Sequence, residues 1–220
     1  MMITKRSRVL GVLLVILCSF SGIALAQDSA TELSVRAQNE CDLGREAKVR
    51  AARLAHFERS QALAERAVAS DDQLAEAHFA LFCSLGEQMR IDGESLSSVF
   101  GFSRMMAALD RTLELNPDHL GALSSKGTFL VRLPAFLGGD AAKGERMLRQ
   151  VVQRDPKAVS ARVTLAKVYA AQGNREQAIT LASEALQLAH SERRGDLLPE
   201  AQVTVVELRP AHAELRTAKP

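Results

Sequence analysis

The chain has 220 residues, with 28 basic and 26 acidic side chains and a formal net charge of +2. Hydrophobic residues make up 47% of it and aromatic residues only 4%, with no tryptophan. The length suffices for one domain with its own core, the composition favours an all-helical protein, and the near-neutral charge speaks against a nucleic-acid-binding role.

The first residues have the pattern of a secretory signal peptide. A basic head over 5–8 precedes an apolar run over 9–20, and small side chains at Ala24 and Ala26 complete a cleavage signal. We therefore expect residues 1–26 to be removed after Ala26, which leaves a periplasmic or secreted protein of slightly negative charge. Membrane contact is then expected only through this leader or through a lipid anchor.

Two alternatives stay open for this segment. The apolar stretch is just long enough to remain as an uncleaved membrane anchor. The other alternative is a lipid on Cys18, as in an outer-membrane lipoprotein, which is disfavoured because Leu17 precedes the cysteine where such signals need a small residue.

The mature chain shows helical hydrophobic spacing almost throughout, divided by short polar breaks. Residues 27–70 are expected to form a degenerate N-terminal hairpin and 71–190 a series of repeated hairpins. Residues 191–220 are expected to be a capping segment and tail. The expected helices span 31–56, 58–69, 73–89, 103–115, 118–133, 140–153, 157–172 and 174–190, with 97–102 as an apolar linker. A capping helix is favoured over 197–208, while 202–206 alone also has the propensity of a strand.

Two turn signals mark the repeat. Asn116-Pro117 and Asp155-Pro156 are each followed by a helix, a glycine-containing turn and a second helix with small residues on its inner face. The distance between the two prolines exceeds the usual unit of about 34 residues. The surplus lies in the loop over 134–139, where Phe136 and Leu137 are expected to contact a partner.

The last of these units resembles the tetratricopeptide repeat. It matches at Leu165, Tyr169, Ala178 and Ala185 and at the Gly173-Asn174 turn. The preceding unit matches at Gly127, Gly139-Asp140 and Pro156, and the one before it at Ala77, Leu81, Leu85, Leu109 and Pro117. The resemblance implies an all-α solenoid of about four helical hairpins.

A narrower resemblance combines the export signal, the irregular repeats and one stretch, which reads Leu133-Pro134, Gly138-Gly139-Asp140 and Lys143-Gly144. Together these features resemble the T-component family of TRAP transporters. The resemblance implies a non-enzymatic accessory of a solute uptake system, with a periplasmic solute-binding protein as partner and self-association into an oligomer.

In a solenoid of this kind the first helix of each hairpin lines the concave face. The expected register gives a small, mostly apolar groove suited to a helix or an apolar ligand. An equally open alternative is that residues 31–69 or the tail fill the groove as core. The residues expected in the groove are Phe79, Cys83, Ser124, Thr128, Val163 and Lys167.

Cys41 and Cys83 remain in the mature chain, in a compartment where disulfides form. With a standard repeat they would lie about eight positions apart on neighbouring parallel helices, roughly 12 Å at about 1.5 Å per residue, which is too far for a bridge. Two buried, reduced cysteines are therefore preferred, and a disulfide stays open.

Other constellations favour structural roles. Gly138-Gly139-Asp140 could suggest a phosphate cradle, but Asp140 is placed to cap the following helix with its own carboxylate. The histidines have no metal-ligand spacing, and no catalytic motif is present, so neither a metal, a cofactor nor an enzymatic activity is expected. The sequence predicts a protein-interaction module. A general envelope assembly scaffold and a binder of a small apolar ligand are the alternatives.

Overall fold

The computed structural model describes residues 28–92 and 97–209, and this part of the chain is α-helical with no strand. The predicted signal peptide over 1–26 and the tail after 209 lie outside the described residues. Every helix within the described ranges is too short or too polar to span a bilayer. The helices are α1 (Ala30–Glu46), α2 (Arg50–Ser70), α3 (Ala75–Asp92), α4 (Ser97–Leu115), α5 (Leu120–Arg132), α6 (Ala141–Arg154), α7 (Val159–Ala171), α8 (Arg175–Ser191) and α9 (Leu198–Leu208), with a short 3-10 helix, η1, at Ala135–Leu137.

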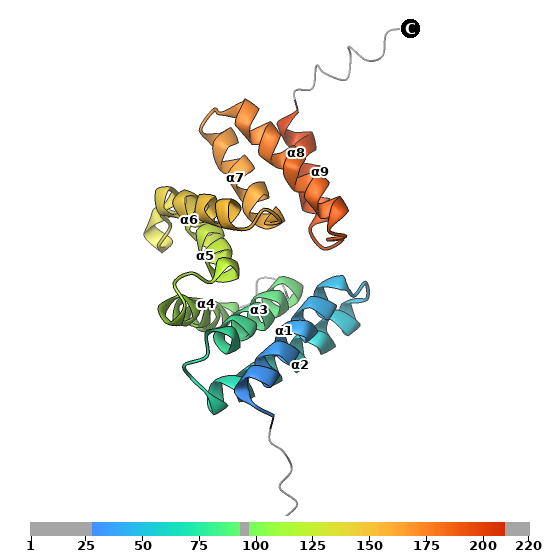
Figure 1. Cartoon of the computed structure of the whole chain (residues 1–220), viewed down its shortest axis with the longest axis vertical. Helices are drawn as coiled ribbons and strands as arrows, with labels where there is room; N and C mark the ends of the chain where they lie inside the picture. The colour runs from blue at the N-terminus through green and yellow to red at the C-terminus, as the bar shows by residue number, and fades with distance from the viewer. Residues whose placement is uncertain (1–27, 93–96, 210–220) are drawn as a thin grey trace, which may run out of the picture.

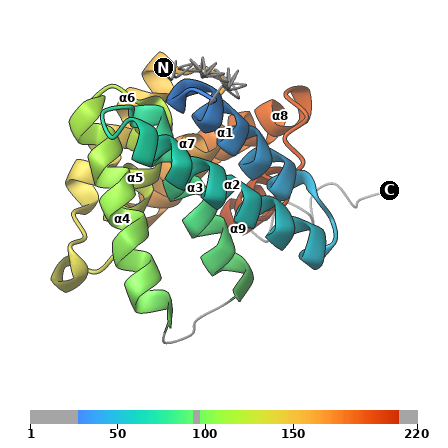
Figure 2. The same ribbon diagram turned by 90° about the horizontal axis from the view of Figure 1, so that it is seen from below.

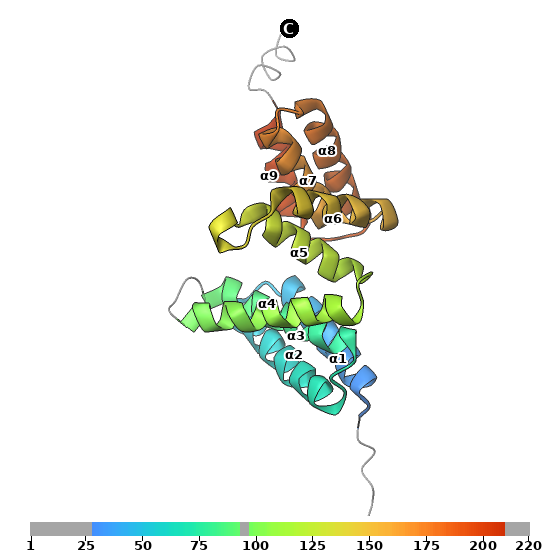
Figure 3. The same cartoon turned by 90° about the vertical axis from the view of Figure 1, so that its left-hand side faces the viewer.

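The helices pair as four successive hairpins, α1–α2, α3–α4, α5–α6 and α7–α8, with α9 packed on α7 and α8. Figures 1 and 3 show the hairpins following one another along the long axis, and Figure 2 shows α3 and α4 side by side. The predicted all-α solenoid of about four hairpins is thus confirmed. Helix α9 covers apolar side chains of α7 and α8, and the strand alternative for 202–206 is wrong.

The first hairpin differs from the sequence prediction. A single helix over 31–56 was expected, but the chain turns at 47–49, where Ala47 and Val49 have extended backbone angles. The hairpin closes tightly because the ring of Phe57 lies against Gly44, where an added Cβ would come within 2.4 Å of the ring. The predicted linker over 97–102 is also wrong, because these residues form the first turns of α4.

The longer first hairpin brings the two cysteines together. Cys41 of α1 and Cys83 of α3 form a disulfide with a Cα–Cα distance of 6.5 Å, so the preference for reduced cysteines is wrong. Their sequence separation is 42, eight more than the standard repeat of about 34 residues, and this surplus removes the expected offset along the helices.

The later turns follow the sequence closely. Gly138 and Gly173 have positive φ values of 88° and 81°, which glycine adopts without strain. The carboxylate of Asp140 accepts a hydrogen bond from the backbone N–H of Lys143 at 2.9 Å and begins α6. The Gly138-Gly139-Asp140 stretch is therefore a structural turn followed by a capped helix.

The chain curves into a C whose two ends face each other (Figure 1). The turn between α1 and α2 lies opposite the loop between α8 and α9, and residues of both segments line one cleft. The inner face of the C carries α1, α3, α5, α7 and α9. This curvature decides which side chains a bound partner can reach.

Candidate functional site: the clefts of the inner face

Aromatic side chains fill the join between the second and third hairpins. The ring of Phe129 on α5 packs edge-on against Phe82 of α3 at 6.3 Å and against Phe102 of α4 at 6.0 Å, measured between ring centroids. Such edge-to-face pairs hold one another in a defined orientation. The join is therefore ordered by three rings rather than by close contact of the helix backbones.

A cleft of about 640 Å³ opens beside these rings, and we call it the aromatic cleft. Its floor is apolar, its edge carries charged groups, and its walls come from five helices. It is lined by Arg45 of α1, by Phe82, Cys83, Gly86, Glu87, Met89 and Arg90 of α3, by Phe102 and Met105 of α4, by Ser125, Phe129 and Arg132 of α5, and by Glu200 of α9.

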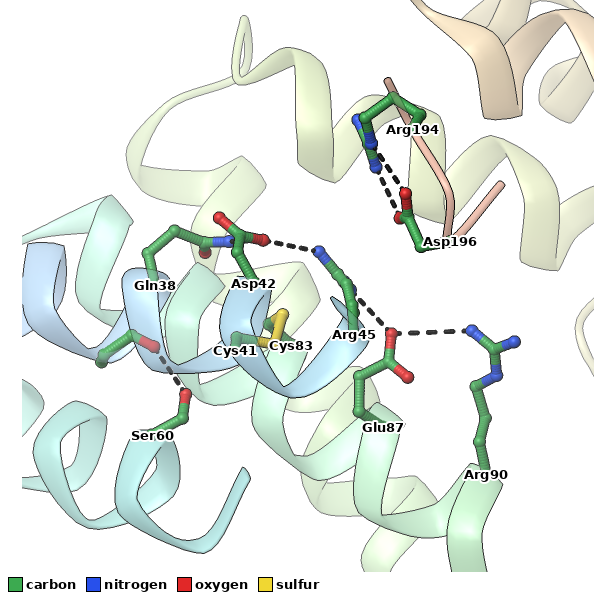
Figure 4. Close-up of polar contacts among 11 residues, drawn as sticks. Gln38, Cys41, Asp42, Arg45, Ser60, Cys83, Glu87, Arg90, Arg194 and Asp196 are labelled. Carbon is green, nitrogen blue, oxygen red and sulfur yellow. Dashed lines mark hydrogen bonds and ion pairs between the residues drawn. A yellow bond between two sulfur atoms is a disulfide. The ribbon is translucent and has the colours of Figure 1, made fainter. Parts of the chain in front are cut away.

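Two contacts on consecutive helical turns join α1 to α3 at one wall of this cleft. The first is the Cys41–Cys83 disulfide, and the second, one helical turn further, is the ion pair of Arg45 with Glu87. The Nε atom of Arg45 lies 2.8 Å from Oε1 of Glu87, and Nη1 of Arg90 lies 3.5 Å from the same oxygen (Figure 4). The position of Glu87 is thus fixed by its own helix, by a neighbouring disulfide and by two arginines.

A second, more polar cleft of about 550 Å³ adjoins the first, and we call it the basic mouth. It lies between the two ends of the C, and the basic groups that line it outnumber the acidic ones among the described residues. The basic groups are Arg45, Lys48, Arg53, Arg90 and Arg194, and the acidic ones are Glu87, Asp196 and Glu200. This charge balance favours acidic or neutral polar groups of a ligand over cations.

Arg194 and Asp196 hold the loop between α8 and α9 in place. Nε and Nη2 of Arg194 donate to the two carboxylate oxygens of Asp196 at 2.9 and 2.8 Å (Figure 4). Burial would raise the pKa of Asp196, but these hydrogen bonds and the charge of Arg194 outweigh it and hold the pKa below its ordinary value. Asp196 therefore stays ionised, and the bidentate pair braces one side of the mouth.

Glu200 links three helices of the inner face. Its Oε1 atom accepts from Nζ of Lys167 on α7 at 2.8 Å and from Nη2 of Arg132 on α5 at 3.1 Å. Burial would raise the pKa of Glu200, but the hydrogen bond and charge of Lys167, with the help of Arg132, keep it below its ordinary value. These bonds place the start of α9 at the edge of the aromatic cleft.

Of the residues that the sequence placed in the groove, Cys83 lines the aromatic cleft, but its sulfur is in the disulfide. Phe79 is half-buried against the ring of His119, 4.3 Å away between centroids. Val163 is buried in a cluster with residues of α8 and α9. Cys83 and Val163 are both almost fully buried, and contact of these three residues with a partner stays a prediction.

The other predicted groove residues form a polar strip. Thr128 donates to the carbonyl of Ser124 at 2.8 Å, and its hydroxyl lies 3.4 Å from that of Thr164. Lys167 is engaged with Glu200. Ser124, Thr128 and Lys167 lie outside the lining of the aromatic cleft. Its α5 wall includes Ser125 and Phe129, each one position after a predicted groove residue. Their contact with a partner stays a prediction.

Both loop residues expose large apolar side chains to solvent. Phe136 is 85% and Leu137 58% exposed. The loop is firmly built, because the carbonyl of Pro134 accepts from the N–H groups of Leu137 and Gly139, and the N–H of Asp140 donates to the carbonyl of Leu130. A role for Phe136 and Leu137 in partner contact stays a prediction.

Sequence reasoning missed the central feature of the site. Glu87, Arg45 and Phe129 were not singled out, because each is unremarkable within its own helix. The sequence does contain one signal for this ion pair, because the same spacing follows each cysteine. Arg45 comes four residues after Cys41, and Glu87 comes four residues after Cys83. Once the cysteines are paired, the charged residues must meet on the next turn.

The two clefts carry groups that can bind a ligand. Within residues 28–92 and 97–209 there is no group of His, Cys, Asp or Glu side chains that could hold a metal ion. The aromatic cleft offers apolar area, and its edge offers charged hydrogen-bonding groups that can orient a ligand.

Comparison with solved structures gives helical-repeat proteins of low sequence identity. A thermophilic TPR protein of Thermus thermophilus is 18% identical, with a TM-score of 0.49 and coverage of 78% of this chain and 98% of that one. MamA of Desulfovibrio magneticus is 16% identical, with a TM-score of 0.44 and coverage of 83% and 98%. YrrB, described as a TPR protein with an unusual peptide-binding site, is 17% identical, with a TM-score of 0.34 and coverage of 73% and 86%.

No curated protein sequence matches this chain. A family model does match part of it, that of the tetratricopeptide repeat, over residues 135–198. This segment runs from η1 through α6, α7 and α8 to the start of α9, and it includes the turn at Gly173 and the small residues Ala178, Ala182 and Ala185 that are buried on α8. Residues 135–198 thus match the tetratricopeptide-repeat family, and helical hairpins continue through the rest of the described chain.

Proposed function

We propose that the chain binds a segment of a partner protein in the aromatic cleft. The observation that carries this proposal is the apolar floor, in which Phe82, Phe102 and Phe129 lie beside Met89 and Met105 at the inner face of a helical solenoid. Methionine and aromatic side chains adapt to an apolar partner surface while the charged edge orients it. Tetratricopeptide-repeat solenoids present extended concave surfaces suited to such contacts.

We further propose that this binding takes place outside the cytosol. The Cys41–Cys83 disulfide supports this, because disulfides persist in oxidising compartments and are rare in the cytosol. The basic and apolar leader over 1–26 is consistent with export, and the same leader leaves a lipoprotein as the alternative.

A narrower form of the proposal is an accessory role in a TRAP-type uptake system. It rests on the resemblance of residues 133–144 to the T-component family and on the export signal. Its test is binding of the purified chain to a solute-binding protein encoded beside its gene, together with native mass spectrometry for self-association. If the chain neither binds this protein nor self-associates, a general envelope assembly scaffold is the better hypothesis.

The direct experiment places a photocrosslinking amino acid at Ser125, which lines the aromatic cleft, in cells that naturally express the chain. The matched control is Gln187 on the exposed side of α8. We expect a defined protein crosslink from Ser125 and none of the same mass from Gln187. Equal crosslinking from both positions, or none from Ser125, would contradict a partner site in this cleft.

A further inference from the structure

Among the described residues, one buried polar atom in the wall of the aromatic cleft lacks a hydrogen-bond partner. Glu87 is only 5% exposed, and both arginines that contact it use the same oxygen, Oε1. The other oxygen, Oε2, is buried and has no partner within the described part of the chain. Buried carboxylate oxygens are seldom left unsatisfied, because the missing hydrogen bond costs free energy that only a donor can recover. Figure 4 shows the contacts on the one oxygen alone.

The surroundings of Glu87 decide which kind of donor fits. A ligand ammonium at Oε2 would share this carboxylate with Arg45 and Arg90, whose nitrogens lie 2.8 and 3.5 Å from Oε1. Further basic groups line the basic mouth. Because like charges repel, these arginines disfavour a second cation beside the same carboxylate. A neutral N–H donor escapes this repulsion and still hydrogen-bonds to the carboxylate.

A second unpartnered atom lies in the adjoining basic mouth. Nε of Arg53 is buried and has no hydrogen-bond partner among the described residues. Glu87 and Arg53 both line the basic mouth, which therefore has one unpaired donor as well as one unpaired acceptor in its walls. A peptide backbone presents an N–H and a C=O at every residue and carries no net charge. It can therefore supply the donor for Glu87 and the acceptor for Arg53 while an apolar side chain lies on the aromatic floor.

We propose that Glu87 and Arg53 form a backbone-reading subsite for an extended, apolar peptide segment of the partner. The inference rests on the proposed function and deepens it, because it states what part of the partner is recognised. The Cys41–Cys83 disulfide one turn before Glu87 keeps the acceptor in place before the peptide arrives, which lowers the entropic cost of binding.

The test uses the purified, disulfide-bonded chain with [methyl-13C]methionine. The NMR signals of Met89 and Met105, which line the aromatic cleft, report binding. The signal of Met147 is the internal control, because Met147 lies on α6 outside the cleft and packs against a core cluster of α5, α6 and α7. Three probes are titrated: N-acetyl-leucine methylamide, its analogue methylated on both nitrogens, and leucine methylamide with its free ammonium. We expect the first to shift the two cleft signals with at least about tenfold higher affinity than the other two.

Two variants assign the preference to Glu87. Glu87→Gln places an amide where the carboxylate oxygen was, and we expect it to abolish the discrimination between the first two probes. Glu40→Gln is the matched control, because Glu40 is also ion-paired, with Arg59 and His56, but lies outside both clefts. We expect Glu40→Gln to leave the discrimination unchanged.

The outcomes separate this inference from the proposed function. Equal affinity for the first two probes in the unaltered chain overturns the role of Glu87, whether or not its variant folds. Stronger binding of the ammonium probe overturns the argument from charge. If no probe moves Met89 or Met105 while Ser125 still crosslinks to a partner, the backbone subsite is wrong and the partner site stands.

Discussion

At the scale of single residues, His119 shows how a side chain of the inner face depends on its protonation state. Its Nδ1 atom accepts a hydrogen bond from the backbone N–H of Ala122 at 3.1 Å and begins α5, while its ring packs against Phe79. Burial lowers the pKa of His119, and the charge of Glu76 opposes this only partly. The neutral ring is therefore the form that fits both contacts.

This predicts a loss of stability in mild acid. Because the folded-state pKa of His119 lies below the unfolded value of about 6.5, the unfolded chain binds the proton more readily, and the free energy of unfolding falls as pH drops below that value. His119→Asn keeps an acceptor suited to a helix N-cap and should weaken this pH dependence. The measurement is urea unfolding between about pH 5 and 8.

His190→Asn is the control, since His190 is exposed at the end of α8 and makes no such cap. It should keep the full pH dependence. The same pH dependence in His119→Asn and in the unaltered chain would show that His119 is not its source.

The turns and helix starts were the residue-level features that the sequence predicted best. The glycine turn at Gly173, the cap at Asp140 and the helix start near Pro199 follow from local chemistry, and the structure has them there. Glu87 could not be found in this way, because its environment is made by Arg45 on another helix. Tertiary partners of that kind leave no trace in the sequence around a residue.

At the scale of elements, α5 and α6 cross where two glycines meet. A Cβ added to Gly144 would lie 2.6 Å from the carbonyl oxygen of Gly127 and 2.7 Å from Cγ2 of Val131. Because the first of these atoms belongs to the backbone, it cannot turn aside as a flexible side chain can. The two helices must therefore move apart to accept any larger residue.

We expect Gly144→Ala to lower the free energy of unfolding by about 1–3 kcal/mol, although alanine is the better helix former. The measurement is denaturant unfolding at neutral pH. Lys143→Ala, an exposed change in the same turn of the same helix, should have little effect. A stabilising effect of Gly144→Ala would show that the crossing is looser than described.

The helix boundaries of the first hairpin were the weakest part of the sequence prediction. Apolar spacing continues from Ala47 to Leu54, so periodicity alone extends one helix through the turn at 47–49. The turn depends instead on the contact of Phe57 with Gly44. Its position also sets the register of the cysteines, and one local error therefore led to the wrong expectation for the disulfide.

At the scale of the whole molecule, the disulfide ties the first hairpin to the second and so fixes one end of the C. Replacing both Cys41 and Cys83 by serine should lower the free energy of unfolding by about 2–4 kcal/mol, because the unfolded chain loses a cross-link over 42 residues. Thermal unfolding with and without dithiothreitol measures this. The unaltered chain should melt lower with the reductant, and the double variant should not respond. Equal melting of both proteins without reductant would contradict a stabilising disulfide.

The central claim is that the aromatic cleft holds the partner. The most direct measurement is calorimetric titration of the purified partner, identified by the crosslink from Ser125, into the unaltered chain and into Ser125→Arg. This substitution places a long charged side chain in the cleft. Gln187→Arg on α8 is the control. We predict at least about tenfold weaker binding for Ser125→Arg, because one or more buried contacts with the partner are lost. Binding of the control should be unchanged. Equal affinity of all three proteins would contradict the claim.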